Sequence, residues 1–220
     1  MGREITKIKG ISEAAILSTC NRFEIYIAAE DANRGVMDVT DFLHRRSNVA
    51  KRELKDNLFV LAEGAAVWHA LRVSGGLESL VVGEGQILSQ MKRCYEISTS
   101  KDGGAGKLLT RMFVTAVTAG KRVRAETGIA KGGVSISSAA VELVEKMCVD
   151  DIGLEMNQLE VAIVGAGKMG RLLVQHLTPR NVRKITLINR SKERAMELVD
   201  MVRDPATALE LERSCQRTRT

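Results

Sequence analysis

A single cysteine stands in a polar stretch between two apolar runs near the start of this 220-residue sequence. The stretch Ser18-Thr19-Cys20-Asn21-Arg22 surrounds the thiol with hydroxyls, an amide and a guanidinium. A positive charge close to a thiol favours the thiolate, which is the nucleophilic form. The pattern is therefore typical of a nucleophilic cysteine. The alternative is that Cys20 is a small apolar residue that closes a strand.

A second chemical signal is glycine-rich. The run Gly165-Ala166-Gly167-Lys168-Met169-Gly170 follows an apolar segment, residues 159–164, that is typical of a buried parallel strand. A helical pattern at 171–177 and a second apolar run at 184–188 come next. This order of strand, G-x-G-x-x-G, helix and strand predicts a dinucleotide-binding unit in which the glycines let the backbone approach a pyrophosphate.

The end of the second run indicates which dinucleotide is bound. A unit that holds both ribose hydroxyls of NAD has Asp or Glu there. This sequence has Asn189-Arg190-Ser191 instead. An amide, a guanidinium and a hydroxyl suit the additional 2′-phosphate, so the sequence favours NADP(H).

Polar candidates also lie in a glycine-rich stretch, residues 74–88, which we interpret as a loop that shapes a pocket. Ser79, Glu84 and Gln86 are its candidate hydrogen-bonding groups, or else ordinary helix-start and capping residues. His69 precedes this loop on a predicted helix. It is either a functional group or a histidine without a role on the helix surface.

The elements that must position these residues are read from hydrophobic periodicity. Two strands, 14–17 and 23–27, place Cys20 in the connection between them. Apolar spacing predicts helices at 34–48, 65–73, 107–125 and 134–146, and a short strand through 58–60. The basic cluster at 120–124 suits either RNA phosphates or the negative end of a helix dipole.

These segments predict an α/β protein with two domains and a tail. Residues 1–132 form an N-terminal α+β catalytic domain, and residues 133–203 form a truncated Rossmann-like dinucleotide-binding unit. Only two strands of that unit are visible, whereas a doubly wound sheet usually has about six. Residues 204–220 are polar, lack a strand pattern and are expected to be unstructured.

Composition limits the remaining classes of function. The net charge of +6 is compatible with an anionic partner. Aromatic residues are only 3% of the chain, which argues against base stacking as the main route to a nucleic acid. The four cysteines are widely spaced and suggest no metal site, and no apolar run is long enough for a membrane span.

Three stretches together resemble the glutamyl-tRNA reductase family. They are Ser18-Thr19-Cys20-Asn21-Arg22 with Glu24 and Tyr26, the pocket loop from Gly76 to Leu88, and Gly120-Lys121-Arg122-Val123-Arg124-Ala125-Glu126-Thr127. The later glycine unit has the matching order and spacing. The family's usual first strand, with its G-x-S/N-x-x-T-A-P-like segment, and its helical dimerisation domain are absent from this sequence.

The resemblance implies an activity. In this family the motif cysteine attacks the ester of glutamyl-tRNA, and NADPH reduces the resulting thioester to glutamate-1-semialdehyde, the first committed step of tetrapyrrole synthesis. Cys20 matches the nucleophile and His69 matches the active-site histidine. Residues at the positions that hold the glutamate moiety and the tRNA end are Thr19, Asn21, Arg22, Ser79, Glu84 and Gln86.

The resemblance also implies homodimerisation. The sequence G-E-G-Q-I-L in the pocket loop favours the plastid stroma over the cytoplasm. Two other functions stay open. One is an NADP-dependent dehydrogenase of a small carbonyl, with a structural Cys20. The other is a catalytically incomplete regulatory or binding fragment.

Overall fold

The computed structural model describes residues 1–130 and 135–202. The chain divides into two compact units, Met1–Lys131 and Gly132–Thr220. The tail expected at 204–220 lies outside the described residues. Among the helices of the described ranges, none is long and apolar enough to cross a membrane.

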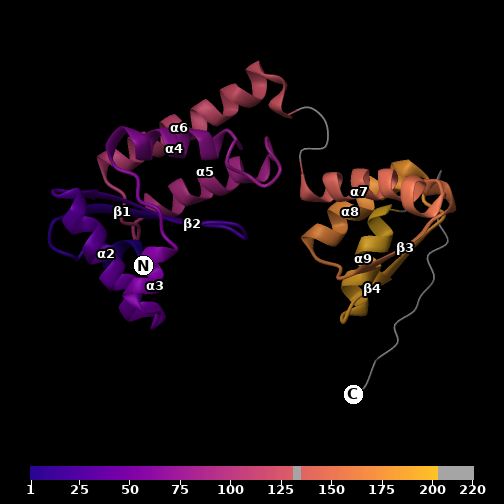
Figure 1. Ribbon diagram of the computed structural model, residues 1–220, viewed down its shortest axis with the longest axis horizontal. Helices are drawn as coiled ribbons and strands as arrows, with labels where there is room; N and C mark the ends of the chain where they lie inside the picture. The colour runs from indigo at the N-terminus through magenta and orange to yellow at the C-terminus, as the bar shows by residue number, and fades with distance from the viewer. Residues whose placement is uncertain (131–134, 203–220) are drawn as a thin grey trace. The chain divides into compact units, whose positions relative to one another are not determined.

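The first unit is an α+β domain built around one β-hairpin (Figure 1). Strand β1 pairs with β2 in antiparallel register, from Ile11 opposite Ala29 to Ser18 opposite Phe23. Its elements are α1 (Gly2–Ile5), β1 (Ile11–Ser18), β2 (Phe23–Ala29), α2 (Ala32–Ser47), α3 (Lys51–Asp56), α4 (Glu63–Ser74), α5 (Gln86–Ser98), α6 (Lys107–Glu126) and the 3-10 turn η1 (Gly128–Ala130).

Helices cover both faces of this hairpin. Helices α4, α5 and α6 cover one face, where Leu17 and Tyr26 join a buried cluster with Phe113 and Met91. Helices α1 and α2 cover the other, where Ile25 and Ile27 pack. Because side chains alternate along a strand, Glu24 and Tyr26 face α4–α6. A carboxylate of β2 is thereby directed into a helix-covered face.

The predicted hairpin strands and the helices at 34–48, 65–73 and 107–125 are confirmed by β1, β2, α2, α4 and α6. The short strand predicted through 58–60 is wrong, because 57–62 forms neither helix nor strand. Its side chains border a cavity of about 270 Å³ beside β2, whose only strand partner among the described residues is β1. A strand needs a neighbour for its peptide groups, and this segment has none there.

The second unit contains the predicted nucleotide-binding pattern. Strands β3 and β4 are parallel, with Glu160 opposite Lys184 and Val164 opposite Ile188, and α8 joins them. Val141, Ile163, Val174 and Leu198 belong to its core. The elements are α7 (Ile136–Met147), η2 (Cys148–Ile152), η3 (Met156–Gln158), β3 (Glu160–Val164), α8 (Lys168–Leu177), η4 (Thr178–Arg180), β4 (Lys184–Ile188) and α9 (Lys192–Val202).

Candidate active site

Cys20 lies at the tip of the β1–β2 hairpin, where its side chain is exposed. Thr19 shapes this turn: its Oγ1 accepts the backbone N–H groups of Asn21 at 3.1 Å and Arg22 at 3.0 Å. Its own N–H donates to the Arg22 carbonyl at 2.9 Å. A threonine that closes a turn on its own backbone fixes a short loop without further contacts. The sequence thus presents Cys20 to solvent on a defined turn.

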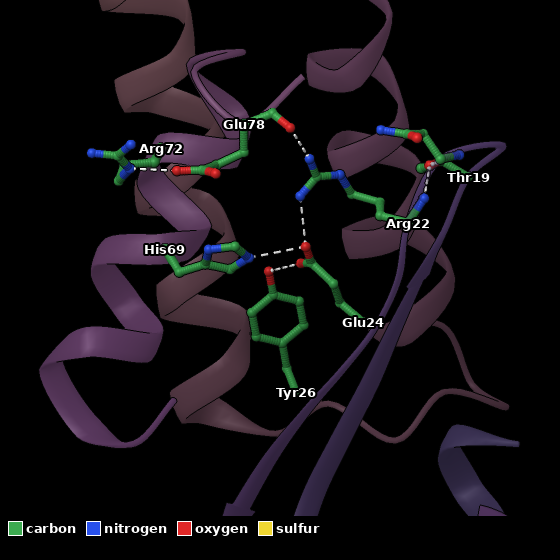
Figure 2. Close-up of polar contacts among 8 residues, drawn as sticks. Thr19, Arg22, Glu24, Tyr26, His69, Arg72 and Glu78 are labelled. Carbon is green, nitrogen blue, oxygen red and sulfur yellow. Dashed lines mark hydrogen bonds and ion pairs between the residues drawn. The ribbon is translucent and has the colours of Figure 1, made fainter. Parts of the chain in front are cut away.

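Beside the turn, a largely buried carboxylate receives three side-chain hydrogen bonds (Figure 2). Glu24 Oε1 accepts from Arg22 Nη1 at 2.7 Å and contacts His69 Nε2 at 2.9 Å. Its Oε2 accepts from the Tyr26 hydroxyl at 2.5 Å. The side chain of Glu24 is only 11% exposed, and that of His69 only 15%. Alternation along β2 and the position of His69 on α4 bring these groups together.

The contacts set the charge of the cluster. Burial opposes ionisation of Glu24 and is the largest single influence, but the hydrogen bonds from Tyr26, His69 and Arg22 together outweigh it. The pKa of Glu24 is therefore lowered. Burial, and then the charge of Glu24, raises the pKa of the Tyr26 hydroxyl, so tyrosine stays a neutral donor.

An ionised Glu24 accepts a hydrogen bond from His69 Nε2, which assigns the ring hydrogen to that nitrogen. No described residue bonds the other ring nitrogen. Nδ1 is thus left as the acceptor nitrogen, and the carboxylate fixes the orientation of the ring.

Glu78 connects the cysteine turn to α4. Its carbonyl oxygen accepts from Arg22 Nη2, and its carboxylate accepts from Arg72 Nε at 2.6 Å. That hydrogen bond lowers the pKa of Glu78. Arg22 and Arg72 therefore lie on two sides of the same residue (Figure 2). Arg22 uses two of its five N–H groups in these contacts, which leaves donors for a ligand.

The pocket loop folds back on itself through glycine. The Gly83 N–H donates to the Gly76 carbonyl at 3.0 Å, and both residues have positive φ. A Cβ at Gly76 would lie 3.1 Å from the Cα of Gly83, so a side chain there would force the loop apart. Arg124 Nη1 donates to the Gly83 carbonyl at 2.7 Å. Part of the basic cluster at 120–124 thus holds this loop.

The expected side chains of that loop are less engaged. Within the described ranges, Ser79, Glu84 and Gln86 make no side-chain hydrogen bond, and each is half-buried. Gln86 begins α5, a helix that the periodicity analysis did not predict. Their assignment as substrate-binding residues stays a prediction. Glu24, Tyr26 and Glu78 were not among the expected site residues, although Glu24 and Tyr26 follow the cysteine motif directly.

In the second unit the glycine loop has the shape that a pyrophosphate needs. Gly165 has φ of +106°, and a Cβ at Gly170 would lie 2.3 Å from the Gly165 carbonyl oxygen. Gly167 precedes α8 and gives it no side-chain cap, so the first N–H groups of that helix, from Lys168 and Met169, have no capping side chain. These features fit a dinucleotide.

The three residues after β4 have separate functions. Asn189 Oδ1 accepts from the Ala166 N–H at 3.2 Å, so this amide ties the glycine loop to β4. The Ser191 hydroxyl donates to Glu193 at 2.8 Å. Arg190 is exposed and has no ion pair among the described residues, which leaves its guanidinium for a phosphate. No group of three or more potential metal ligands occurs in the described part of the chain.

The fold and the site define a class of protein: a cysteine-bearing α+β domain followed by a Rossmann-like domain of the type that binds nicotinamide dinucleotides. Residues 1–127 match the family described as the N-terminal domain of glutamyl-tRNAGlu reductase, and residues 146–217 match shikimate/quinate 5-dehydrogenase. The chain belongs to the glutamyl-tRNA reductase family. The resemblance noted from the sequence motifs is confirmed.

Relatives at similar distance occur in algae, cyanobacteria and plants. The chain is 48% identical to a glutamyl-tRNA reductase of Cyanophora paradoxa over 92% of its own length and 45% of the relative. It is 46% identical to a chloroplastic glutamyl-tRNA reductase of Oryza sativa subsp. indica, over 94% and 37%. A solved structure of the reductase from Methanopyrus kandleri matches with a TM-score of 0.58 and 36% identity, over 91% and 46%. The chain thus spans less than half the length of these relatives.

Proposed function

We propose that this chain carries the glutamyl-accepting and nicotinamide-binding parts of an NADPH-dependent glutamyl-tRNA reductase. The observation that carries the proposal is the exposed Cys20 thiol on a turn whose Arg22 converges with His69 on buried Glu24. An exposed thiol on the same turn as Arg22, whose partner Glu24 also orients an imidazole, suits attack on an activated ester. Family membership supports the identity of that ester as glutamyl-tRNA.

The transfer exchanges the oxygen ester of the tRNA for a thioester on Cys20. The Cys20 thiolate forms a bond to the carbonyl carbon of the glutamyl ester, and the bond from that carbon to the ribose oxygen of the tRNA breaks. His69 Nδ1 takes the proton that leaves the Cys20 thiol, while Glu24 holds Nε2, and passes it to the ribose oxygen as that oxygen leaves. The remaining N–H groups of Arg22 hold a substrate carboxylate. Asn21 at the same turn and Ser79, Glu84 and Gln86 on the pocket loop contact the other polar groups of the glutamyl moiety.

NADPH, when bound, supplies the hydride that turns the thioester into glutamate-1-semialdehyde, the first committed product of tetrapyrrole synthesis. The glycine loop and the first N–H groups of α8 hold the pyrophosphate. Arg190 pairs with the 2′-phosphate, which makes NADPH the preferred nucleotide.

The chloroplastic relatives support a location in the plastid, with the stroma as the proposed compartment and a homodimer as the proposed assembly.

The test is transfer of labelled glutamate to protein. The chain is mixed with tRNA that carries radioactive glutamate, and the tRNA is then digested with ribonuclease. The protein is separated on an acidic denaturing gel and counted with and without hydroxylamine, which cleaves thioesters. We expect hydroxylamine-sensitive label on the wild-type chain and loss of that label in Cys20→Ser. Cys148→Ser is the matched control, because Cys148 is buried and should leave the label unchanged.

Two results would overturn the proposal. One is the absence of label on a folded wild-type chain with intact glutamyl-tRNA. The other is equal label on wild type and Cys20→Ser. A separate fluorescence titration compares NADPH with NADH, and Arg190→Gln should weaken NADPH binding by about tenfold with little effect on NADH.

A further inference from the structure

The aromatic residues of this chain are few, but the exposed ones gather at one place. The sequence has seven, all in the described ranges, and the exposed members are Phe23, Phe59 and Trp68. Phe23 follows Arg22 directly. The Phe59 ring lies 5.5 Å from that of His69 in an edge-on arrangement, and Trp68 is the neighbour of His69 on α4. Phe23 and Phe59 also line the cavity that includes His69, and Trp68 adjoins His69 in the sequence of α4.

Trp68 combines with a cation on the same helix face. Residues four apart on a helix are neighbours, which places Arg72 one turn beyond Trp68. The indole is 62% exposed and the Arg72 side chain 45% exposed. Glu78 holds Arg72 through Nε only, so both of its Nη groups can bind a ligand. A flat apolar ring beside a guanidinium fits one nucleotide, with the base on the ring and the phosphate on the cation.

The position of this pair suits a nucleotide that carries the reacting ester. Glu78 binds Arg72 through its carboxylate and Arg22 through its carbonyl, and Arg22 is two residues from Cys20. An aminoacyl-tRNA bears its ester on the ribose of the last adenosine. When Cys20 attacks that ester, the base and the phosphate of this adenosine lie within one nucleotide of the thiol. The contacts through Glu78 join Arg72 to the turn that bears the thiol.

We infer that Trp68 and Arg72 form a subsite for the 3′-terminal adenosine of the tRNA: the adenine stacks on the indole, and the phosphate pairs with the guanidinium. This inference rests on the proposed function, since it names a part of the same substrate. It also refines the expectation drawn from composition. Aromatic residues are scarce, but a single exposed ring is sufficient to hold one base.

Trp68 is the only tryptophan of the chain, so its fluorescence reports the contact directly. The probe is a short RNA hairpin that ends in single-stranded ACCA, without an amino acid. We expect saturable quenching by this RNA and none by the same RNA without its terminal adenine. In a binding assay with labelled RNA, Trp68→Ala should lose about tenfold in affinity, as should removal of the adenine from the RNA.

A double-mutant cycle that combines Trp68→Ala with removal of the terminal adenine makes the test specific. If the adenine stacks on Trp68, its removal costs no further affinity in Trp68→Ala. Leu108→Ala is the matched control, because Leu108 is 67% exposed on α6 and should leave affinity unchanged. Arg72→Gln should weaken binding and lower the salt dependence by about one phosphate contact, and Arg72→Lys should restore most of that dependence.

The inference is overturned if Trp68→Ala binds the RNA within about twofold of wild type, if the two losses add in full, or if the folded chain binds no RNA. The outcome is separable from that of the proposed function. Quenching of Trp68 without glutamyl transfer to Cys20 retains the subsite and rejects the reductase. If Trp68→Ala leaves both glutamyl transfer to Cys20 and RNA affinity unchanged, the reductase is retained and the subsite is rejected.

Discussion

Glu24→Gln removes the negative charge on which three donors converge while it keeps the size of the side chain. Arg22 then retains a guanidinium that is 13% exposed and has lost its ion partner. The new side chain also has an amide nitrogen, which is a donor, where Glu24 has an accepting oxygen, so this nitrogen faces another donor. Removal of one member of a buried ion pair costs about 3 to 5 kcal/mol, and the partial exposure here places the expected loss near the lower end, about 3 kcal/mol.

The assay is urea unfolding followed by the fluorescence of Trp68, which lies in the first unit and reports that unit alone. Tyr26→Phe is the control, because it deletes one donor and leaves the charge. We expect it to cost about 1 kcal/mol.

The pH dependence provides a second measurement. Because the pKa of Glu24 is lowered in the folded chain, its stabilising contribution is complete above the unfolded value of about 4.3 and is lost as pH falls through the folded value. The difference between wild type and Glu24→Gln should therefore shrink below about pH 4. The other charged or titratable groups near Glu24 are the same in wild type and variant: Arg22, Tyr26, His69 and Cys94. A loss under about 0.5 kcal/mol at pH 7 would refute the reasoning.

Three further predictions concern other sites. Gly170→Ala places a methyl group 2.3 Å from the Gly165 carbonyl oxygen, so NADPH affinity in a fluorescence titration should fall by at least about tenfold. Glu13→Gln should lower the free energy of unfolding by about 2 kcal/mol in urea, because the buried carboxylate accepts the first N–H groups of α6, from Leu108 at 3.0 Å and Leu109 at 2.8 Å. In a Cys215→Ser background, a thiol reagent at pH 8 should label Cys20 rapidly and spare Cys94, whose pKa burial and the charge of Glu24 raise to about 12.

Controls accompany these three. Gly128→Ala adds a methyl group to open space and should leave NADPH affinity unchanged. Equal unfolding midpoints for wild type and Glu13→Gln would show that the carboxylate does not cap α6. Equal labelling of Cys20 and Cys94 in the folded chain would contradict the burial of the second thiol.

Much of the fold follows from local patterns in the sequence. Alternation around Cys20 predicted the hairpin, and the glycine spacing predicted the β3–α8–β4 unit. Helix α5 was missed because its glycine-rich approach suggested a loop, although Ile87, Met91 and Cys94 recur at helical spacing and are buried. That spacing is a signal the sequence already contained.

The site was harder to predict because it depends on what covers a strand. A charged residue that alternates with apolar ones usually faces water, so Glu24 was not expected at the centre of a cluster. Its burial depends on α4, α5 and α6, which come from distant parts of the chain. The strand expected at 58–60 failed for the related reason that pairing, unlike periodicity, requires a second segment.

The outer side of β2 has a consequence for handling the protein. In the described residues β2 pairs with β1 alone, and the lining of the cavity beside it includes apolar side chains of α2 and of residues 58–61. A strand edge with unpaired peptide groups is a template for further sheet growth. Concentrated solutions of this chain should therefore gain β-structure over time, and Phe23→Lys, at a position of β2 that is 47% exposed, should slow that growth.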